Sequence, residues 1–214
     1  MSIRKKKGNS KRSRWEHIVE AASRVFFEKG YYLATIEDIE TESGLTRGSI
    51  YYHFKNKDDI YFSVLALGLR LLRDELRWVA RTTKGGPEEL VLRLLDCYCE
   101  FSRAHREYIK ILEHFYSGWD SKVGLPEELV EEINRLIFEC LQEVVTVLRQ
   151  GADEGLFAVK DPFVAAVLLW SMIGSALRKT TDNPRAAFLG IEWDTMKTAL
   201  KDNILKSLQK GTAP

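Results

Sequence analysis

The sequence contains few cysteines, the residues that form disulfides in secreted proteins and bind metal ions. Only three of its 214 residues are cysteine, namely Cys97, Cys99 and Cys140. Three is an odd number, and no signal-like apolar segment follows the basic start of the chain. We therefore expect reduced thiols and a cytoplasmic protein. On a helix Cys97 and Cys99 would lie roughly 200° apart, which is poor geometry for a shared metal ion, so no metal site is predicted.

Long apolar runs and strand-like alternation are also missing. The longest apolar stretch, residues 163–174, is shorter than the ~20 residues that a membrane-spanning helix needs. It predicts a buried helix and no membrane partner. No repeat of fixed period is visible. Because no segment alternates apolar and polar residues as a strand does, the sequence predicts an all-α fold.

The chain lacks a strong net charge, but its charges are unevenly placed. The formal net charge is +1, yet residues 1–57 hold 12 Lys and Arg against 7 Asp and Glu, while residues 58–214 hold 20 against 24. A basic small segment joined to an acidic larger one indicates a polyanion partner for the first part only. Residues 1–10 belong to a basic tail that we expect to be disordered.

The residue patterns of catalysis are missing too. There is no phosphate-cradling glycine loop, no nucleophile elbow and no metal-ligand spacing. His105 and His114 are nine residues apart, about 180° around a continuous helix, so they would not face a common substrate. We therefore predict neither an enzyme nor a cofactor.

What is present begins with three short helices. Apolar periodicity from residue 15 to 26 predicts a first helix that ends at Gly30, which can adopt a positive φ. A second, very short helix should begin after the N-cap Thr35 and end at Gly44. Thr46 then caps a third helix of about two turns. Two short helices joined by a turn that contains glycine are typical of a helix-turn-helix.

A larger helical domain is predicted over residues 58–214. Its first helix is long and begins after Lys57. Glycine and proline mark the ends of further helices, at about 87–104, 106–117, 126–153, 162–181 and 189–209. The prediction is an N-terminal three-helix domain, residues 1–57, followed by a larger helical domain, with about nine helices in total.

The third helix has two different faces. Ile50 and Phe54, four residues apart, should pack on the first two helices. The opposite face carries Gly48 and Tyr52, and Arg47 stands at the helix start. Such a face suits the major groove, where arginine binds guanine with two hydrogen bonds and a tyrosine ring lies on a thymine methyl group. The alternative is that the aromatic side chains of residues 51–53 pack into the core.

Residues 26–57, FFEKGYYLATIEDIETESGLTRGSIYYHFKNK, closely resemble the N-terminal signature of the TetR family of transcriptional regulators. The matching elements are a phenylalanine before Gly30-Tyr31, then Thr35, Ile39, Gly44, Ser49-Ile50-Tyr51-Tyr52-His53-Phe54 and Lys57. The resemblance is specific, but it covers only about a quarter of the chain. Beyond it, the likeness is one of helix number and layout.

The resemblance implies a DNA-binding regulator that reads a near-palindromic operator with its third helix. It places a set of side chains at the DNA surface: Thr35, Thr46, Arg47, Gly48, Ser49, Tyr51, Tyr52, His53 and Lys57. The tail around Arg12 and Arg14 would add phosphate or minor-groove contacts. Most of the family represses transcription, which implies a repressor. Glu40 stands where the family usually has alanine, so either helix 2 shifts slightly or Glu40 pairs with a base such as Arg47.

The family likeness also implies a homodimer formed by the last two helices. An apolar stripe of Trp193, Met196, Leu200 and Ile204 is consistent with that interface, and the 162–177 helix is apolar nearly all round. An exposed face of this kind calls for a partner. The alternative is that both helices are fully buried within one subunit.

The middle helices hold many aromatic residues, most of which would be expected in any core. As a group they could line a pocket for a hydrophobic or amphipathic small molecule, such as a fatty acyl compound. The candidate lining residues are Tyr98, Phe101, His105, Phe115, Tyr116, Trp119, Phe138 and Trp170. The sequence leaves a second possibility open, in which a protein of this fold acts mainly by binding another protein.

Overall fold

The computed structural model describes residues 13–117, 125–180 and 186–209, which are almost entirely helical. Within these ranges there are nine α-helices and one short 3-10 helix, and the only β contact is an isolated bridge between Phe157 and Gln209. The elements are α1 Arg14–Leu33, α2 Ile36–Ser43, α3 Arg47–His53, α4 Lys57–Thr82, α5 Pro87–Ala104, α6 Arg106–Tyr116, α7 Glu127–Asp153, α8 Pro162–Leu177, η1 Ala187–Leu189 and α9 Trp193–Leu208. The predicted all-α fold is confirmed.

Caps define the short N-terminal helices. The Thr35 hydroxyl accepts a hydrogen bond from the Asp38 backbone N at 3.1 Å, and the Asp38 carboxylate accepts one from the Thr35 backbone N at 2.9 Å. This reciprocal pair fixes the start of α2. Gly44 ends α2 with a φ of 66°, and Gly30 bends α1 with a φ of 73°, both of which glycine adopts without a steric cost. Helix α1 therefore bends at its predicted end and continues to Leu33.

The three N-terminal helices pack around a small apolar core. Ile18 of α1, Ile39 of α2 and Ile50 of α3 are completely buried at its centre. At the surface, Lys29 of α1 donates a hydrogen bond to the Asp38 carboxylate at 2.6 Å. This cationic partner holds the pKa of Asp38 at about 2. Apolar packing thus holds the helix-turn-helix together, and ion pairs align its first two helices.

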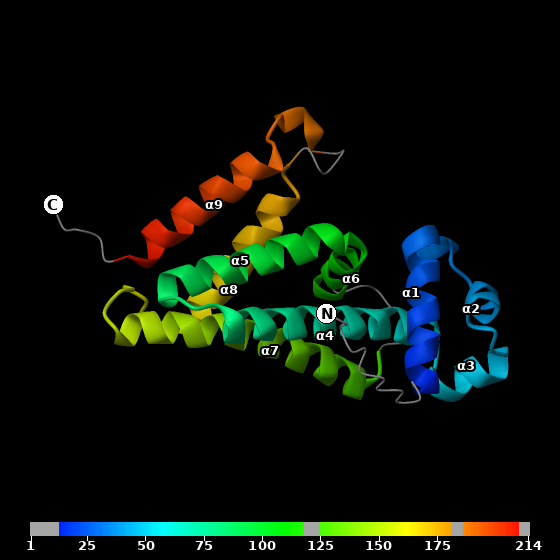
Figure 1. Ribbon diagram of the computed structural model, residues 1–214. Coiled ribbons are helices and arrows are strands. Elements are labelled where there is room, and N and C mark those ends of the chain that lie inside the picture. Colours follow the sequence, from blue (N-terminus) through cyan, green and yellow to red (C-terminus); the bar gives the residue numbers. More distant parts are fainter. Residues whose placement is uncertain (1–12, 118–124, 181–185, 210–214) are drawn as a thin grey trace, which may run out of the picture.

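Helix α4 is the central element that joins the two parts of the molecule (Figure 1). It packs against α1 at one end and against α5, α6 and α7 along its length. Gly68 allows α6 to come close, because the Tyr108 ring occupies the place that a side chain at position 68 would take. The same ring meets Phe27 of α1 edge-on, with the centroids 5.0 Å apart. Tyr108 therefore contacts both the long helix and the N-terminal domain.

Helix α9 corrects two predictions. It begins at Trp193 instead of residue 189, because Gly190 takes a left-handed conformation with a φ of 62° after η1. Its apolar stripe packs inward: Trp193, Leu200 and Ile204 are buried in the protomer's own core, and Met196 is half-buried against it. A stripe that its own protomer covers is not available to a second subunit. For Trp193, Leu200 and Ile204, burial within one subunit is the alternative that holds.

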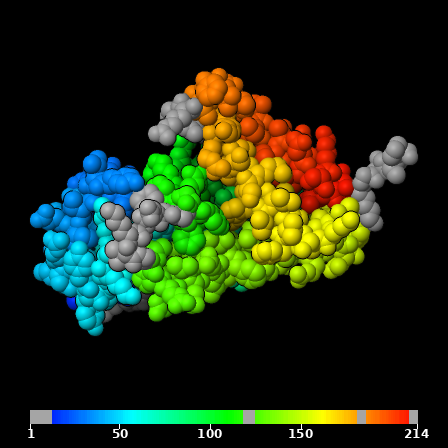
Figure 2. All heavy atoms as spheres, turned by 180° about the vertical axis from the view of Figure 1, so that it is seen from behind, coloured from blue at the N-terminus to red at the C-terminus, as the bar shows by residue number. Residues whose placement is uncertain are grey.

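Helix α8 is apolar on both of its faces. Its inner face, with Ala166, Leu169 and Ile173, is buried. The opposite face lies at the surface in Figure 2, where its side chains stay partly exposed. These exposed residues are Phe163, Val164, Val167, Leu168 and Met172. The unpartnered apolar surface is therefore on α8 and not on α9.

Candidate nucleic-acid interface and effector cavity

The outer side of α3 carries side chains that were predicted to meet DNA. Arg47 and Gly48 are exposed, and Tyr51 and Tyr52 are 42% and 85% exposed. Ile50, on the opposite side, is completely buried and anchors the helix. The idea that the tyrosines pack into the core therefore does not hold for either of them. Both rings therefore lie on the outer side of α3, beside Arg47 and Gly48.

Local contacts orient this surface. The Arg47 guanidinium lies over the Tyr51 ring, 5.7 Å from its centroid, at a distance typical of a cation–π contact. It forms this contact instead of the pair with Glu40 that the sequence suggested. The Thr46 hydroxyl accepts a hydrogen bond from the Ser49 backbone N at 3.4 Å and caps the helix. Arg47 and Tyr51 thus extend from a helix whose start is fixed.

Other predicted DNA-contacting residues surround α3. Arg14 is exposed at the start of α1, and Thr35 is exposed at the start of α2. His53 is half-buried at the end of α3, with its ring edge-on to Tyr52 at a centroid distance of 5.1 Å. Arg12 lies outside the described residues, as does the basic tail.

Lys57 lies at the joint between the domains. Its ammonium group donates hydrogen bonds to the carbonyl oxygens of Tyr31 at 2.7 Å and Ala34 at 3.0 Å. It also lies 4.3 Å from the centroid of the Tyr31 ring. Burial lowers the pKa of this lysine. These contacts fasten the end of α1 to the start of α4, and they engage the Lys57 ammonium with the protein's own backbone.

Further contacts link α6 to the N-terminal domain through α4. The Tyr61 hydroxyl of α4 lies 2.7 Å from Nδ1 of His114 in α6. The Tyr61 ring also meets Phe26 and Tyr31 edge-on, with centroids 5.1 and 4.8 Å apart, and the Tyr31 hydroxyl donates a hydrogen bond to Asp58. Burial lowers the pKa of His114. A displacement of α6 or α4 would therefore change the contacts at the end of α1.

An apolar cavity lies between α4, α5, α7 and α8. The stacked rings of Tyr98 and Trp170, with centroids 4.3 Å apart, form part of its wall. Its remaining lining is aliphatic: Leu76, Val91, Leu94, Leu95, Leu141, Val144, Ala166, Leu169 and Ile173. The free space is about 30 Å³, enough for roughly two water molecules. A larger ligand would have to move the walls.

Only two of the predicted pocket residues, Tyr98 and Trp170, line this cavity. Phe101 is buried against His105, with the ring centroids 4.5 Å apart, and Phe115 packs on Phe62. Tyr116 and Phe138 are 59% and 49% exposed. Trp119 lies outside the described residues. The sequence could not mark the aliphatic lining, because leucine and valine at core positions look the same whether or not a space lies between them.

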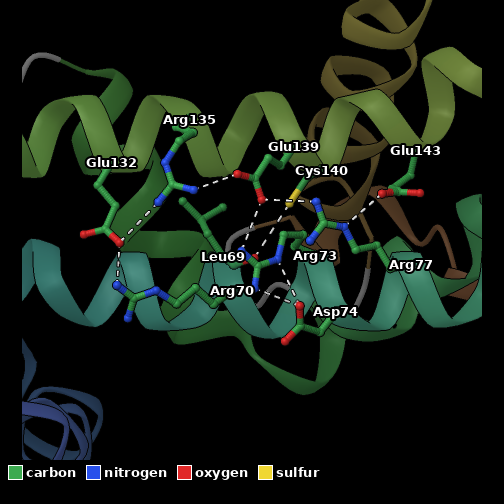
Figure 3. Close-up of polar contacts among 10 residues, drawn as sticks. All are labelled: Leu69, Arg70, Arg73, Asp74, Arg77, Glu132, Arg135, Glu139, Cys140 and Glu143. Atoms are coloured by element: carbon green, nitrogen blue, oxygen red, sulfur yellow. Dashed lines mark hydrogen bonds and ion pairs between the residues drawn. The ribbon is translucent and has the colours of Figure 1, made fainter. Parts of the chain in front are cut away.

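Three arginines of α4 face three glutamates of α7 in a ladder of ion pairs (Figure 3). The pairs are Arg70–Glu132, Arg73–Glu139 at 3.1 Å, Arg77–Glu139 at 3.2 Å and Arg77–Glu143 at 3.1 Å. The ladder was not predicted, although its signal is present in the sequence. The arginines follow the i, i+3, i+7 spacing of one helix face, and the acids recur on one face of the later helix.

The described residues offer no metal site. Within residues 13–117, 125–180 and 186–209, no group of three His, Cys, Asp or Glu side chains is placed to hold an ion. Burial raises the pKa of the Cys97, Cys99 and Cys140 thiols to about 12. These thiols are therefore protonated at neutral pH and are poor ligands and nucleophiles. In the same part of the chain, no helix is long and apolar enough to cross a membrane.

Comparison with known proteins agrees with this geometry. Residues 18–64 match the family described as bacterial regulatory proteins, tetR family. The HTH-type transcriptional regulator TtgR of Pseudomonas putida is 38% identical over 183 residues, which are 83% of this chain and 84% of TtgR. The HTH-type transcriptional repressor BepR of Brucella suis is 24% identical over 169 residues, covering 77% of this chain and 78% of BepR.

Solved structures share the fold at lower identity. A transcriptional regulator from Saccharomonospora viridis in complex with choline superposes with a TM-score of 0.72 at 22% identity, over 92% of this chain and 97% of that one. The regulator FadR from Bacillus subtilis in complex with stearoyl-CoA has a TM-score of 0.66 at 19% identity, over 94% of this chain and 100% of that one. At these identities the likeness is one of fold.

Proposed function

This chain belongs to the TetR family of bacterial regulatory proteins, and we propose that it is a dimeric cytoplasmic repressor released from a near-palindromic operator by a hydrophobic small molecule. The observation that carries the DNA-binding half of this proposal is the exposed face of α3, where Tyr52 is 85% exposed beside Arg47 and Gly48. The repressor role is supported by BepR, a relative that is named a repressor.

On DNA, the α3 residues divide into base readers and positioning residues. Arg47 binds the edge of a guanine, and the Tyr52 ring lies on a thymine methyl group. Gly48 allows the helix to come close, since nothing lies within 4 Å of the place where a side chain would begin. Thr35 and Ser49 contact phosphate oxygens and fix the register of the helix in the groove.

Dimerisation uses the outer face of α8. Val164 and Leu168, four residues apart on this face, are 51% and 60% exposed. Apolar residues around them extend the patch, and Phe138 of α7 adjoins it through a ring contact with Phe163 at 5.8 Å. Contiguous apolar surface of this kind is unfavourable in water and is covered when two copies pair. Pairing also places two copies of α3 in successive major grooves, roughly 34–36 Å apart.

The effector is apolar or amphipathic because the lining of the cavity is apolar. Its wall offers aliphatic side chains, the two stacked rings and no charged group. A charged ligand would lose its hydration there without a compensating partner. Solved proteins of this fold hold stearoyl-CoA in one case and choline in another, so the fold accommodates more than one ligand chemistry. The aliphatic lining favours an acyl or other hydrophobic group here.

Helix α4 carries the signal to the DNA-binding domain. Leu76, near its far end, lines the cavity, and Lys57 at its start holds the end of α1. The helix has 26 residues and spans about 39 Å. A ligand that prefers one position of α4 shifts the equilibrium only by its difference in affinity for the two states. A coupling of about 1–3 kcal/mol would weaken operator binding some 5–150-fold.

The test is a gel-shift assay with the DNA that flanks the gene for this protein. We expect a single specific band that survives excess random DNA. Tyr52→Ala should abolish it, whereas Phe188→Ala, which removes an aromatic side chain of matching 84% exposure on η1, should not. Equal loss in both variants would contradict the assignment of α3. Absence of any specific band would favour the alternative, in which the protein acts through a protein partner.

A further inference from the structure

Helix α8 separates the apolar cavity from the exposed apolar face. Ala166 and Trp170 line the cavity on its inner side. Val164 and Leu168 lie roughly 160° around the helix from Ala166, one in each direction, and are exposed on the outer side. One helix is thus the wall of the effector cavity and, under the proposed function, the surface of the subunit interface.

The other walls of the cavity are tied to neighbouring helices by charged side chains. The ladder of Figure 3 links α4 to α7 through Arg73, Arg77 and their partners. Helix α5 is linked to α9 in a similar way, since Lys201 donates a hydrogen bond to Asp96 at 2.8 Å. Each pair contributes little alone, but a network resists the separation of the helices that it joins.

Among the described residues, the polar and charged contacts that link helix α8 to its neighbours lie near its two ends. From Pro162 to Leu177 it contains no charged residue. At its start, Asp161 accepts hydrogen bonds from two of the helix's own backbone amides at 2.9 and 3.1 Å, and just before it the Ala158 backbone N donates a hydrogen bond to the Leu208 carbonyl of α9 at 2.7 Å. Arg178, just beyond its end, pairs with Glu113 of α6 at 2.8 Å. Between these two points apolar packing alone holds the helix in place.

We infer that filling the cavity bows α8 outward, so that effector binding and subunit association oppose each other. The inference rests on the proposed dimer and effector. The cavity offers about 30 Å³, whereas ligand pockets usually hold about 300–1,000 Å³, so a wall must move, and α8 is the wall that has no charged side chain along its length to tie it to a neighbour. Because both ends of α8 are fixed, its middle protrudes, and a face that fits its copy when straight loses contact when bowed. The linkage is reciprocal: dimerisation weakens effector binding by the same factor.

The experiment fills the cavity from within, so that it needs no known ligand. Ala166→Leu adds three carbon atoms on the cavity side of α8, and Ala22→Leu makes the same change in the completely buried core of α1. We expect Ala166→Leu to raise the dimer dissociation constant about tenfold or more in sedimentation equilibrium, and Ala22→Leu to leave it unchanged. Adding Leu94→Ala on the α5 wall conserves the total volume and should restore the dimer.

The possible results distinguish failure of the proposed dimer from failure of the coupling between cavity and interface. A wild-type monomer at micromolar concentration would refute the dimer, and the inference with it. A wild-type dimer that Ala166→Leu does not weaken, or that Ala22→Leu weakens equally, overturns the inference alone. Failure of Leu94→Ala to restore association overturns it as well. If Ala166→Leu does not fold, Ala166→Val gives the same comparison with an expected increase of about threefold.

Discussion

Gly68 is the residue at which α6 comes closest to α4, and its replacement by alanine gives a sharp test of that contact. A Cβ atom at position 68 would lie 2.5 Å from Cγ and 3.0 Å from Cβ of Tyr108. Ordinary contacts between carbon atoms are about 3.5–4.0 Å, so the ring must move by about 1 Å. The ring is also held on its other side by Phe27. Gly68→Ala therefore pushes α6 away from α4 or away from the N-terminal domain.

Two opposing terms set the size of the effect. Overpacking a core costs about 1–3 kcal/mol, and replacing glycine by alanine inside a helix returns about 0.5–1 kcal/mol. We expect Gly68→Ala to lower the free energy of unfolding by about 0.5–2 kcal/mol. Gly48→Ala is the matched control, because nothing lies within 4 Å of its added methyl group. That variant should be as stable as the wild type or more so, by up to about 0.5 kcal/mol, yet bind the operator less well.

Urea unfolding followed by circular dichroism measures both variants, with the slope m checked for constancy. The sign of the Gly68→Ala effect should reverse in a Tyr108→Ala background, where the methyl group meets open space and only the helix propensity remains. Destabilisation of equal size with and without the Tyr108 ring would refute the reasoning. So would a Gly68→Ala protein that is more stable than the wild type.

Other expectations follow from the DNA-facing, joint, interface and buried histidine positions. Arg47→Ala should lose about 1–3 kcal/mol of operator affinity and discrimination at one base per half-site, measured by competitive gel shift; equal loss on random DNA would contradict base reading. Lys57→Met should lower the free energy of unfolding through two lost charge-assisted hydrogen bonds, by about 1–3 kcal/mol, without flattening the salt dependence of DNA binding. Leu168→Glu should give a folded monomer in sedimentation, whereas Leu200→Glu should unfold the chain, because it places a charge in the core. Burial lowers the pKa of His114 in the folded state. The contribution of this residue to stability should therefore be fully present above the unfolded pKa near 6.5 and be lost as the pH drops through the folded pKa. His114→Gln should reduce this loss, measured as urea unfolding midpoints between about pH 5 and 8.

The sequence determined the helix-turn-helix because local signals fix it. The reciprocal cap at Thr35, the left-handed glycine at 44 and the buried Ile50 each depend on residues only a few positions apart, or on one helix face. Helix periodicity and caps are properties of short segments, so they can be read without knowing what packs against them. The same helical periodicity that places Ile50 on the buried face of α3 places Tyr52 on the exposed face.

Only the tertiary structure decided which faces of the later helices are covered. Helices α8 and α9 both carry apolar residues, but α9 turns Trp193 and Leu200 inward while α8 leaves Leu168 at the surface. An apolar stripe indicates a covered face and does not indicate which subunit covers it. The ammonium of Lys57 illustrates the same limit: it binds two carbonyl oxygens that lie 26 and 23 residues earlier in the chain. Such contacts, like the space inside the cavity, exist only once distant segments pack together.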